Sequence, residues 1–116
     1  RVPRRANRPK YEAPLQDVQR AMGILRKDAK KWGLDPKRIG ILGFSAGGNL
    51  AMMALTSYEK RAYAPIDQAD GFSCRPDFGI LIYPAYLVDR VKRDALFPEV
   101  QITQNSPPLL FCTYWR

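Results

Sequence analysis

The chain of 116 residues contains no histidine, and it contains only two cysteines. Histidine is the side chain that most often acts as a general base in enzymes, so any base among these residues is of another type. Cys74 and Cys112 lie far apart and show no metal-binding spacing, so no metal site is expected. No apolar run approaches the roughly 20 residues that span a bilayer, so we expect no membrane segment.

Acidic residues are also missing from the first ten positions, RVPRRANRPK, which carry five of the basic residues. Of the formal net charge of +8, this leaves +3 for the other 106 residues. A basic arm can bind phosphates, but no base-reading helix or aromatic stacking platform is apparent in the sequence. We therefore interpret residues 1–10 as a solvated, proline-containing loop and expect no nucleic-acid partner. The alternative, a basic nucleic-acid-binding domain, would show salt-dependent binding to DNA.

The length suits one domain, and 46% apolar with 26% charged residues is a globular composition. Apolar residues recur every three or four positions from Pro14 to Trp32, which predicts a helix over 14–32 with one apolar stripe. Pro14 suits the first helical turn, and Gly33 suits the position just past the last one. The stripe consists of Leu15, Val18, Met22, Leu25, Ala29 and Trp32.

Three short apolar runs predict β-strands at 38–43, 78–83 and 109–114. Helix-forming residues predict a second helix over 46–58, and the polar stretch 59–77 is interpreted as a loop. The strands are apolar throughout and do not alternate, which is typical of a parallel sheet covered on both faces. Together these elements predict an α/β domain.

A single serine lies in the turn between the first strand and the second helix, in GILGFSAGGNL. Gly43 and Gly47 flank Ser45 in a G-x-S-x-G pattern, and strand–turn–helix is the context of a nucleophile elbow. Such a sharp bend places the serine in a sparsely populated backbone conformation that costs about 1–3 kcal/mol. We expect that side chains at Gly43 and Gly47 would collide across the bend.

The start of the second helix adds two features to this turn. Gly48 lets the helix approach the sheet closely, and the backbone amide of Ala46 points to where an oxyanion would form. The alternative is a Gly-Ser turn in which Ser45 only caps the helix.

Three stretches, WGLDPKRIGILGFSAGGNLA, RPDFGILIYPAYL and SPPLLF, closely resemble the α/β-hydrolase superfamily in its carboxylesterase and acetyl-xylan-esterase-like branch. The resemblance runs over nearly the whole chain. It implies that Ser45 is the acyl-accepting nucleophile and that Ala46 supplies one oxyanion amide. It also implies a small-molecule or carbohydrate ester as substrate, with no metal or organic cofactor.

The same resemblance implies further catalytic groups that the chain lacks. The superfamily uses Ser, then Asp or Glu, then His, and this sequence contains no base of that kind. Five aspartates follow the serine, but none follows the third strand: Asp67, Asp70, Asp77, Asp89 and Asp94. Asp89, past the second strand, is the nearest substitute for the acid, although we favour a solvated loop carboxylate. The catalytic acid is therefore not assigned, and no lysine has a spacing that supports a Ser-Lys pair.

The loop containing His-Gly-Gly, which donates the second oxyanion amide in the family, is absent too. We therefore expect residues 1–116 to form a single incomplete α/β-hydrolase domain, without the early strands and without the Asp/His part. In such a domain, apolar surface on the first strand would be left open. The intact enzyme would hydrolyse carboxylic esters through an acyl-serine, while the chain alone would be inactive. The alternative is a hydrolase remnant without catalysis, with a binding role or none.

Overall fold

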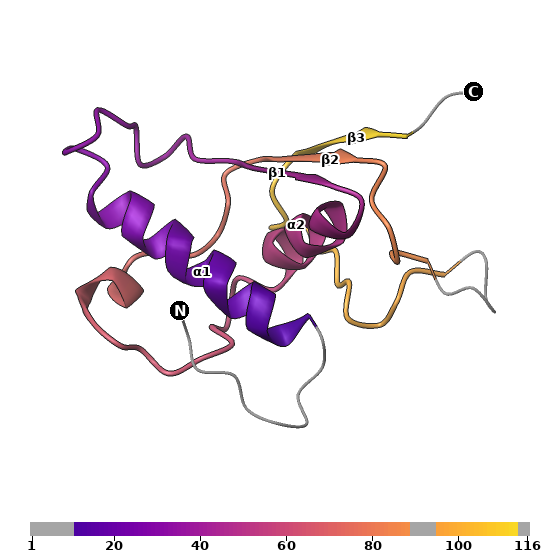
Figure 1. Cartoon of the computed structure of the whole chain (residues 1–116), viewed down its shortest axis with the longest axis horizontal. Coiled ribbons are helices and arrows are strands. Elements are labelled where there is room, and N and C mark those ends of the chain that lie inside the picture. The colour runs from indigo at the N-terminus through magenta and orange to yellow at the C-terminus, as the bar shows by residue number, and fades with distance from the viewer. Residues whose placement is uncertain (1–10, 89–94, 114–116) are drawn as a thin grey trace.

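A computed structural model describes residues 11–88 and 95–113 of the chain. Two α-helices and three strands follow in the order helix, strand, helix, strand, strand, as predicted for an α/β domain (Figure 1). The elements are α1 (Glu12–Lys27), β1 (Ile41–Phe44), α2 (Ala46–Thr56), the 3₁₀-helix η1 (Gln68–Gly71), β2 (Gly79–Ile82) and β3 (Leu109–Cys112).

The three strands form one sheet in the order β1-β2-β3, and both pairs are parallel. In register, Ile41 lies beside Gly79, and Gly79 lies beside Leu109. The predicted parallel sheet is confirmed, with strands of four residues each that are shorter than predicted. Tyr114, the predicted end of the third strand, lies outside the described residues.

The core lies between the sheet and α2. Leu81 in the central strand is fully buried, and so are Ala51 and Leu55 on α2. Gly79 makes this close packing possible, because a Cβ atom at that position would overlap the side chain of Leu55. Helix α1 packs against α2 and η1 on the same side of the sheet (Figure 1).

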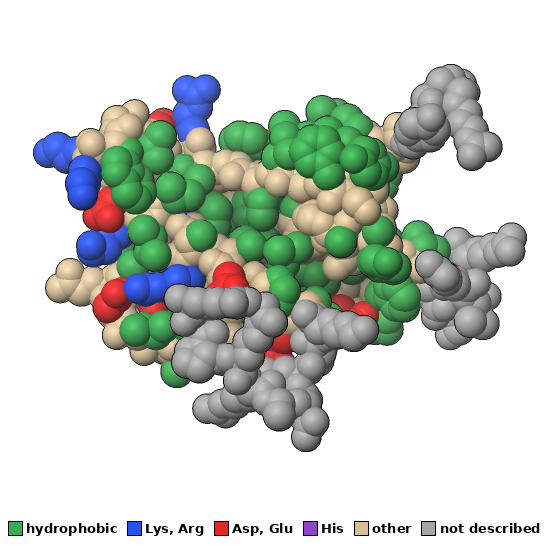
Figure 2. All heavy atoms as spheres, in the orientation of Figure 1, with side chains coloured by type: hydrophobic (Ala, Val, Ile, Leu, Met, Phe, Trp, Pro, Cys, Tyr) green, Lys and Arg blue, Asp and Glu red, His purple; other side chains and the backbone are tan. Residues whose placement is uncertain are grey.

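The opposite face of the sheet is not covered by any element among the residues that the structure describes. Leu42, Phe44 and Leu110 belong to this face, and they are 53%, 51% and 59% exposed. Figure 2 shows hydrophobic side chains gathered along the sheet. The open apolar surface expected on the first strand is thus present, and cover on both faces is not found in the described part of the chain.

Helix α1 ends at Lys27, five residues before the predicted end at Trp32. The following residues form turns: the amide of Leu34 donates to the carbonyl of Ala29 (2.8 Å), and Gly33 adopts a left-handed φ of +66°. These turns rotate the last stripe position out of the core, so Trp32 is 46% exposed. Helix α1 begins at Glu12, two residues before the predicted start at Pro14, and the apolar stripe is confirmed at Leu15 and Met22, which are buried.

Candidate active site

Ser45 is the single residue between the end of β1 and the start of α2. Its backbone has φ +49° and ψ −117°, a left-handed conformation that only a few non-glycine residues of the described chain adopt. Ser45 is exposed, and its side chain makes no capping hydrogen bond to α2. Ser45 thus lies on the sharp strand–turn–helix bend that the sequence predicted, and the side chain does not cap the helix.

The glycines around Ser45 have different roles. A Cβ atom on Gly43 would overlap the Gly47 carbonyl and come within 2.8 Å of the Gly48 amide nitrogen, so the expected collision is real there. At Gly47 the expectation was wrong, because an added Cβ atom has no described atom within 4 Å. The bend turns the α-carbon of Gly47 outward while its carbonyl faces β1. Gly48 allows a close approach instead: its Cβ would lie 2.8 Å from Cβ of Pro84.

Ala46 is the first residue of α2 and is exposed beside Ser45. Amides in the first turn of a helix have no partner within the helix, and the helix dipole places partial positive charge there. An oxyanion formed on a carbonyl attached to Ser45 would meet such a donor. The position suits the predicted role of the Ala46 amide.

The segment that follows β2 is bound to the elbow, which the sequence did not predict. The amide of Ala85 donates to the carbonyl of Ser45 (2.9 Å), and Nδ2 of Asn49 donates to the carbonyl of Tyr86 (3.0 Å). Tyr83 and Tyr86 both have positive φ, +34° and +57°. Residues of this kind persist in such conformations only where surrounding contacts impose them. Pro84 after an apolar run was the one local sign of this turn.

A cavity of about 580 Å³ opens beside this segment. Its lining is mostly apolar and comprises Pro84, Ala85, Tyr86, Leu87, Val88, Phe97 and Phe111. Ala85 connects the cavity wall to the elbow through its hydrogen bond to Ser45. An apolar hollow with few polar groups is typical of small-molecule sites.

The family model described as BD-FAE matches residues 4–82. The chain belongs to the BD-FAE family. Its fold and its relatives place it in the esterase branch of the α/β hydrolases.

Two curated relatives of this BD-FAE family member come from bacteria. An acetylxylan esterase from Xylanibacter ruminicola is 36% identical over 76 residues, which cover 66% of this chain and 13% of that protein. Endo-1,4-beta-xylanase B from Butyrivibrio fibrisolvens is 35% identical over 125 residues, covering 93% of this chain and 19% of that protein. The chain thus spans less than a fifth of the length of these relatives.

Solved structures share the fold of this family member. The acetyl ester-xyloside bifunctional hydrolase from Caldicellulosiruptor lactoaceticus superposes with a TM-score of 0.70 at 31% identity. That match covers 85% of this chain and 43% of the hydrolase chain. Esterase 2 from Thermogutta terrifontis gives a TM-score of 0.70 at 23% identity, over 89% of this chain and 44% of that one, and shows the fold alone.

Three of the five aspartates that follow Ser45 in this BD-FAE chain lie among the described residues, and arginines engage all three. Asp77 pairs with Arg26 (2.9 Å) and accepts from the amide of Ile39, at the end of the sheet where β1 and β2 begin. Asp67 and Asp70 both pair with Arg20 on α1, and Asp70 also pairs with Arg61. Asp89 and Asp94 lie outside the described residues.

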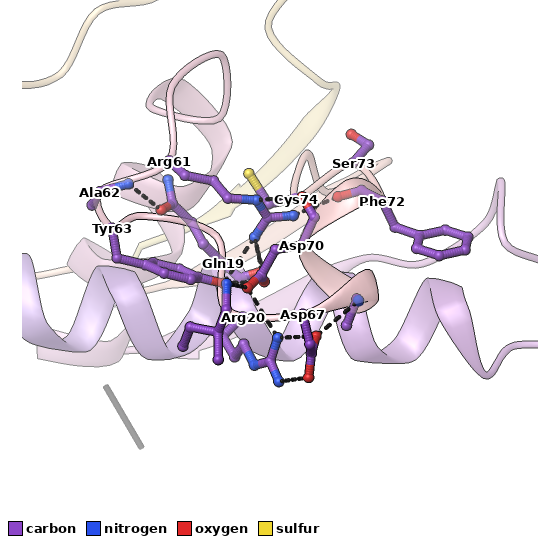
Figure 3. A network of polar contacts seen from close by, with 12 residues as sticks. Gln19, Arg20, Arg61, Ala62, Tyr63, Asp67, Asp70, Phe72, Ser73 and Cys74 are labelled. Atoms are coloured by element: carbon purple, nitrogen blue, oxygen red, sulfur yellow. Dashed lines mark hydrogen bonds and ion pairs between the residues drawn. The ribbon is translucent and has the colours of Figure 1, made fainter. Parts of the chain in front are cut away.

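Asp67 and Asp70 belong to a polar cluster between α1 and η1, drawn in Figure 3. We call it the α1–η1 polar cluster. Its members are Gln19, Arg20, Arg61, Tyr63, Asp67 and Asp70. Arg20 donates two hydrogen bonds of 2.7 Å to Asp67 and lies 3.0 Å from Asp70. Tyr63 donates to Asp70 at 2.5 Å.

These contacts shift the ionisation of the cluster. Hydrogen bonds from Arg20 and from the Ala69 amide hold the pKa of Asp67 well below its usual range. Burial alone would raise the pKa of Asp70, but hydrogen bonds from Tyr63, the Ile66 amide and Arg20 outweigh burial and lower that pKa. Burial and the hydrogen bond to Asp70 raise the pKa of Tyr63 to about 12. The cluster is therefore charged and internally satisfied at neutral pH, which is typical of a structural element.

The stretch 59–77, predicted as a loop, contains most of this cluster and the 3₁₀-helix η1. Arg61 in this stretch donates to the backbone carbonyls of Gln19, Asp70 and Phe72. Gln19 in turn accepts from the amide of Ala62 (2.8 Å). Sequence reasoning missed these residues; the one available sign was the position of Gln16 and Gln19 on the buried side of α1.

Two negative findings hold for the residues that the structure describes. None of the helices in 11–88 and 95–113 is long and apolar enough to cross a membrane. Within the same ranges, no three His, Cys, Asp or Glu side chains are grouped to hold a metal ion.

Proposed function

We propose that the chain is the nucleophile-bearing part of a serine esterase. Ser45 Oγ attacks the carbonyl carbon of a carboxylic ester, the alcohol leaves, and water then hydrolyses the acyl-Ser45 intermediate. The observation that carries this proposal is the strained, exposed backbone of Ser45 at the junction of β1 and α2. Strained backbone conformations of this kind cluster at active sites, which supports a catalytic role for Ser45.

Stabilisation of the intermediate would come from the start of α2. The Ala46 amide donates to the oxyanion, and the helix dipole adds to the attraction. A second donor belongs, in this proposal, to a loop outside the 116 residues. Loss of one such donor typically reduces the rate by about 10²–10³.

The proposal places the general base and its acid partner outside these 116 residues as well. The sequence holds no histidine, and the described aspartates Asp67, Asp70 and Asp77 are engaged by arginines. The chain spans 43% of its structural relative from Caldicellulosiruptor, which leaves more than half of that fold to supply the two groups. Residues 1–116 would then be one incomplete hydrolase domain.

For the substrate we propose an acetyl or other short acyl ester, carried by a small molecule or a carbohydrate. The relatives are named for acetylxylan and acetyl ester-xyloside substrates, which supports a carbohydrate alcohol. The apolar cavity of about 580 Å³ beside the Ala85 segment could hold the apolar part of such an ester. The chemistry needs neither a metal nor an organic cofactor.

The second candidate is a hydrolase remnant without catalysis, and the missing histidine favours it for the chain by itself. In both cases the chain alone should show no turnover of p-nitrophenyl acetate beyond background, with Ser45→Ala as the matched control. Turnover of several molecules per second that Ser45→Ala abolishes would reveal a base within the chain. It would contradict the proposal that the base lies elsewhere.

A chemical-rescue experiment separates the two candidates. The chain is treated with a fluorophosphonate probe with and without imidazole, and each serine peptide is quantified by mass spectrometry. We expect slow labelling of Ser45 that imidazole accelerates, while Ser73, which is also exposed, stays at background. Equal labelling of both serines under both conditions would contradict a nucleophilic role for Ser45.

A further inference from the structure

The chain carries a second surface of distinct chemistry at the end of the molecule away from the elbow. Residues 28–38, here called the basic turn, connect α1 to β1. Ser45 follows the last residue of β1, so the basic turn and the elbow lie at opposite ends of that strand (Figure 1). Binding at the basic turn would leave the elbow free.

Positive charge is concentrated in the basic turn. Its four cations are Lys30, Lys31, Lys37 and Arg38, and all four are exposed. Its two aspartates are engaged otherwise: Asp28 pairs with Lys27, and Asp35 accepts from the amide of Lys37. Figure 2 shows Lys and Arg side chains projecting from this end of the molecule. The four cations have no ion-pair partner within the described ranges.

Two apolar side chains stand among these cations. Trp32 is 46% exposed and Leu34 is 41% exposed. Both lie on an ordered backbone, since Trp32 and Leu34 donate to the carbonyl of Ala29 and Arg26 Nε donates to the carbonyl of Pro36 (3.1 Å). The turn therefore presents Trp32 and Leu34 in a fixed arrangement.

We propose that the basic turn binds the surface of a lipid bilayer with anionic headgroups. Trp and Leu side chains partition into the boundary between headgroups and acyl chains, and nearby lysines attract anionic lipids. Lysine stems can lie along the apolar region while their ammonium groups reach the phosphates. The contact is peripheral and separate from the elbow.

The composition of the turn favours a bilayer over other anionic partners. Single-stranded nucleic acid is usually bound by successive aromatic side chains, and the turn offers only Trp32. An acidic polysaccharide needs hydrogen-bond acceptors for its hydroxyl groups, but both carboxylates of the turn are already engaged. Neither partner gives a role to the exposed Leu34, whereas a bilayer does.

The first test is sedimentation of the full chain with vesicles of phosphatidylcholine, with and without about 30% phosphatidylserine. We expect binding to the anionic vesicles that salt weakens. Reversal of two charges in Lys30→Glu/Lys31→Glu should lower the partition coefficient at least about 25-fold, and Trp32→Ala about tenfold. Lys60→Glu, an exposed lysine elsewhere, should bind as the parent does.

Two other sources of binding are controlled. Arg4→Ala/Arg5→Ala tests the basic residues near the start of the sequence, and this variant should retain binding. Equal binding to neutral vesicles would mean adsorption through the uncovered sheet face and would overturn the proposal. Unchanged binding by Lys30→Glu/Lys31→Glu would also overturn it.

The second test follows Trp32 directly. In a Trp115→Phe background Trp32 is the only tryptophan, because the chain contains two. Anionic vesicles should shift its emission to shorter wavelength, and brominated lipids should quench it. An unchanged spectrum, with equally strong retention on DNA or an acidic polysaccharide, would show a general polyanion site and overturn the bilayer proposal.

Discussion

The elbow and the α1–η1 polar cluster differ in how far their polar side chains are buried and hydrogen-bonded. At the elbow, Ser45 is exposed, uncapped and held at a positive φ. In the cluster, the carboxylate of Asp70 is fully buried, yet it accepts from Tyr63 and Ile66 and pairs with Arg20 and Arg61. One region thus holds an exposed hydroxyl on a strained backbone, and the other stabilises the fold by satisfying each buried charge.

The largest effect is expected where the elbow depends on close backbone packing. Gly43→Ala should destabilise the chain by more than about 4 kcal/mol, because its Cβ overlaps the Gly47 carbonyl and neither backbone can move freely. Urea unfolding followed by circular dichroism measures this loss. A change below about 1 kcal/mol would show that the bend relaxes easily.

The next largest effect is expected in the cluster. Asp70→Ala should cost about 3 kcal/mol in the free energy of unfolding, because Arg61 would lose its buried counter-ion. Asp67→Ala is the matched control, since that side chain is 54% exposed and that of Asp70 is 0% exposed. Equal effects of the two substitutions in urea titrations would contradict the difference that we draw from burial.

Acid pH should affect the cluster more than the elbow. The pKa values of Asp67 and Asp70 are lowered in the folded chain, so their stabilisation is present above the unfolded pKa near 3.8. It is lost as the pH falls below that value towards the folded pKa values. Thermal midpoints measured from pH 6 to pH 3 should fall in the parent and less steeply in Asp70→Asn. Parallel curves would argue against the linkage.

At the elbow, removal of the serine side chain should stabilise the protein. Ser45→Gly should gain about 1 kcal/mol, because glycine adopts positive φ without steric strain. The expected sign is opposite to that of Asp70→Ala. A loss of stability in the same urea experiment would show that Ser45 is not strained.

The smallest effect is expected at Gly47, the other glycine of the motif. Gly47→Ala should change stability by about 0.5 kcal/mol in the favourable direction, since alanine is the better helix former and meets no atom. Compared with Gly43→Ala, it tests whether the two glycines serve different purposes. A large destabilisation would restore the simpler view that both are needed for the bend.

Local patterns predicted the elements and the elbow but not the contacts between distant segments. A helix is predicted by the spacing of apolar residues such as Leu15 and Met22, and the bend is predicted by Gly43 two residues before Ser45. Both patterns involve residues that are close in the sequence, so the sequence alone reveals them. The pairing of Arg20 with Asp67 joins residues 47 positions apart, and it has no local signature. The sharp turns at Tyr83 and Tyr86 are likewise imposed by tertiary hydrogen bonds.

The end of α1 was also predicted only in part. Ala29 and Trp32 continue the helical spacing, but the hydrogen bond from Leu34 to Ala29 and the left-handed Gly33 close the chain into turns. Gly33 was predicted just beyond the helix, and the stripe placed the boundary too late. The apolar spacing alone therefore does not determine the last residue of the helix.

The parallel register of the sheet also determines when the elbow can form during folding. The central strand β2 pairs with β1 and with β3. Each pairing joins residues that are roughly 30 to 40 positions apart, so a loop of that length must close before the two strands can pair. Contacts within α1 and α2 need no such closure and can form first. The conformation of Ser45 relies on hydrogen bonds that join it to Ile82 and Ala85. On a ribosome, the elbow would therefore remain unformed until β2 has emerged from the exit tunnel.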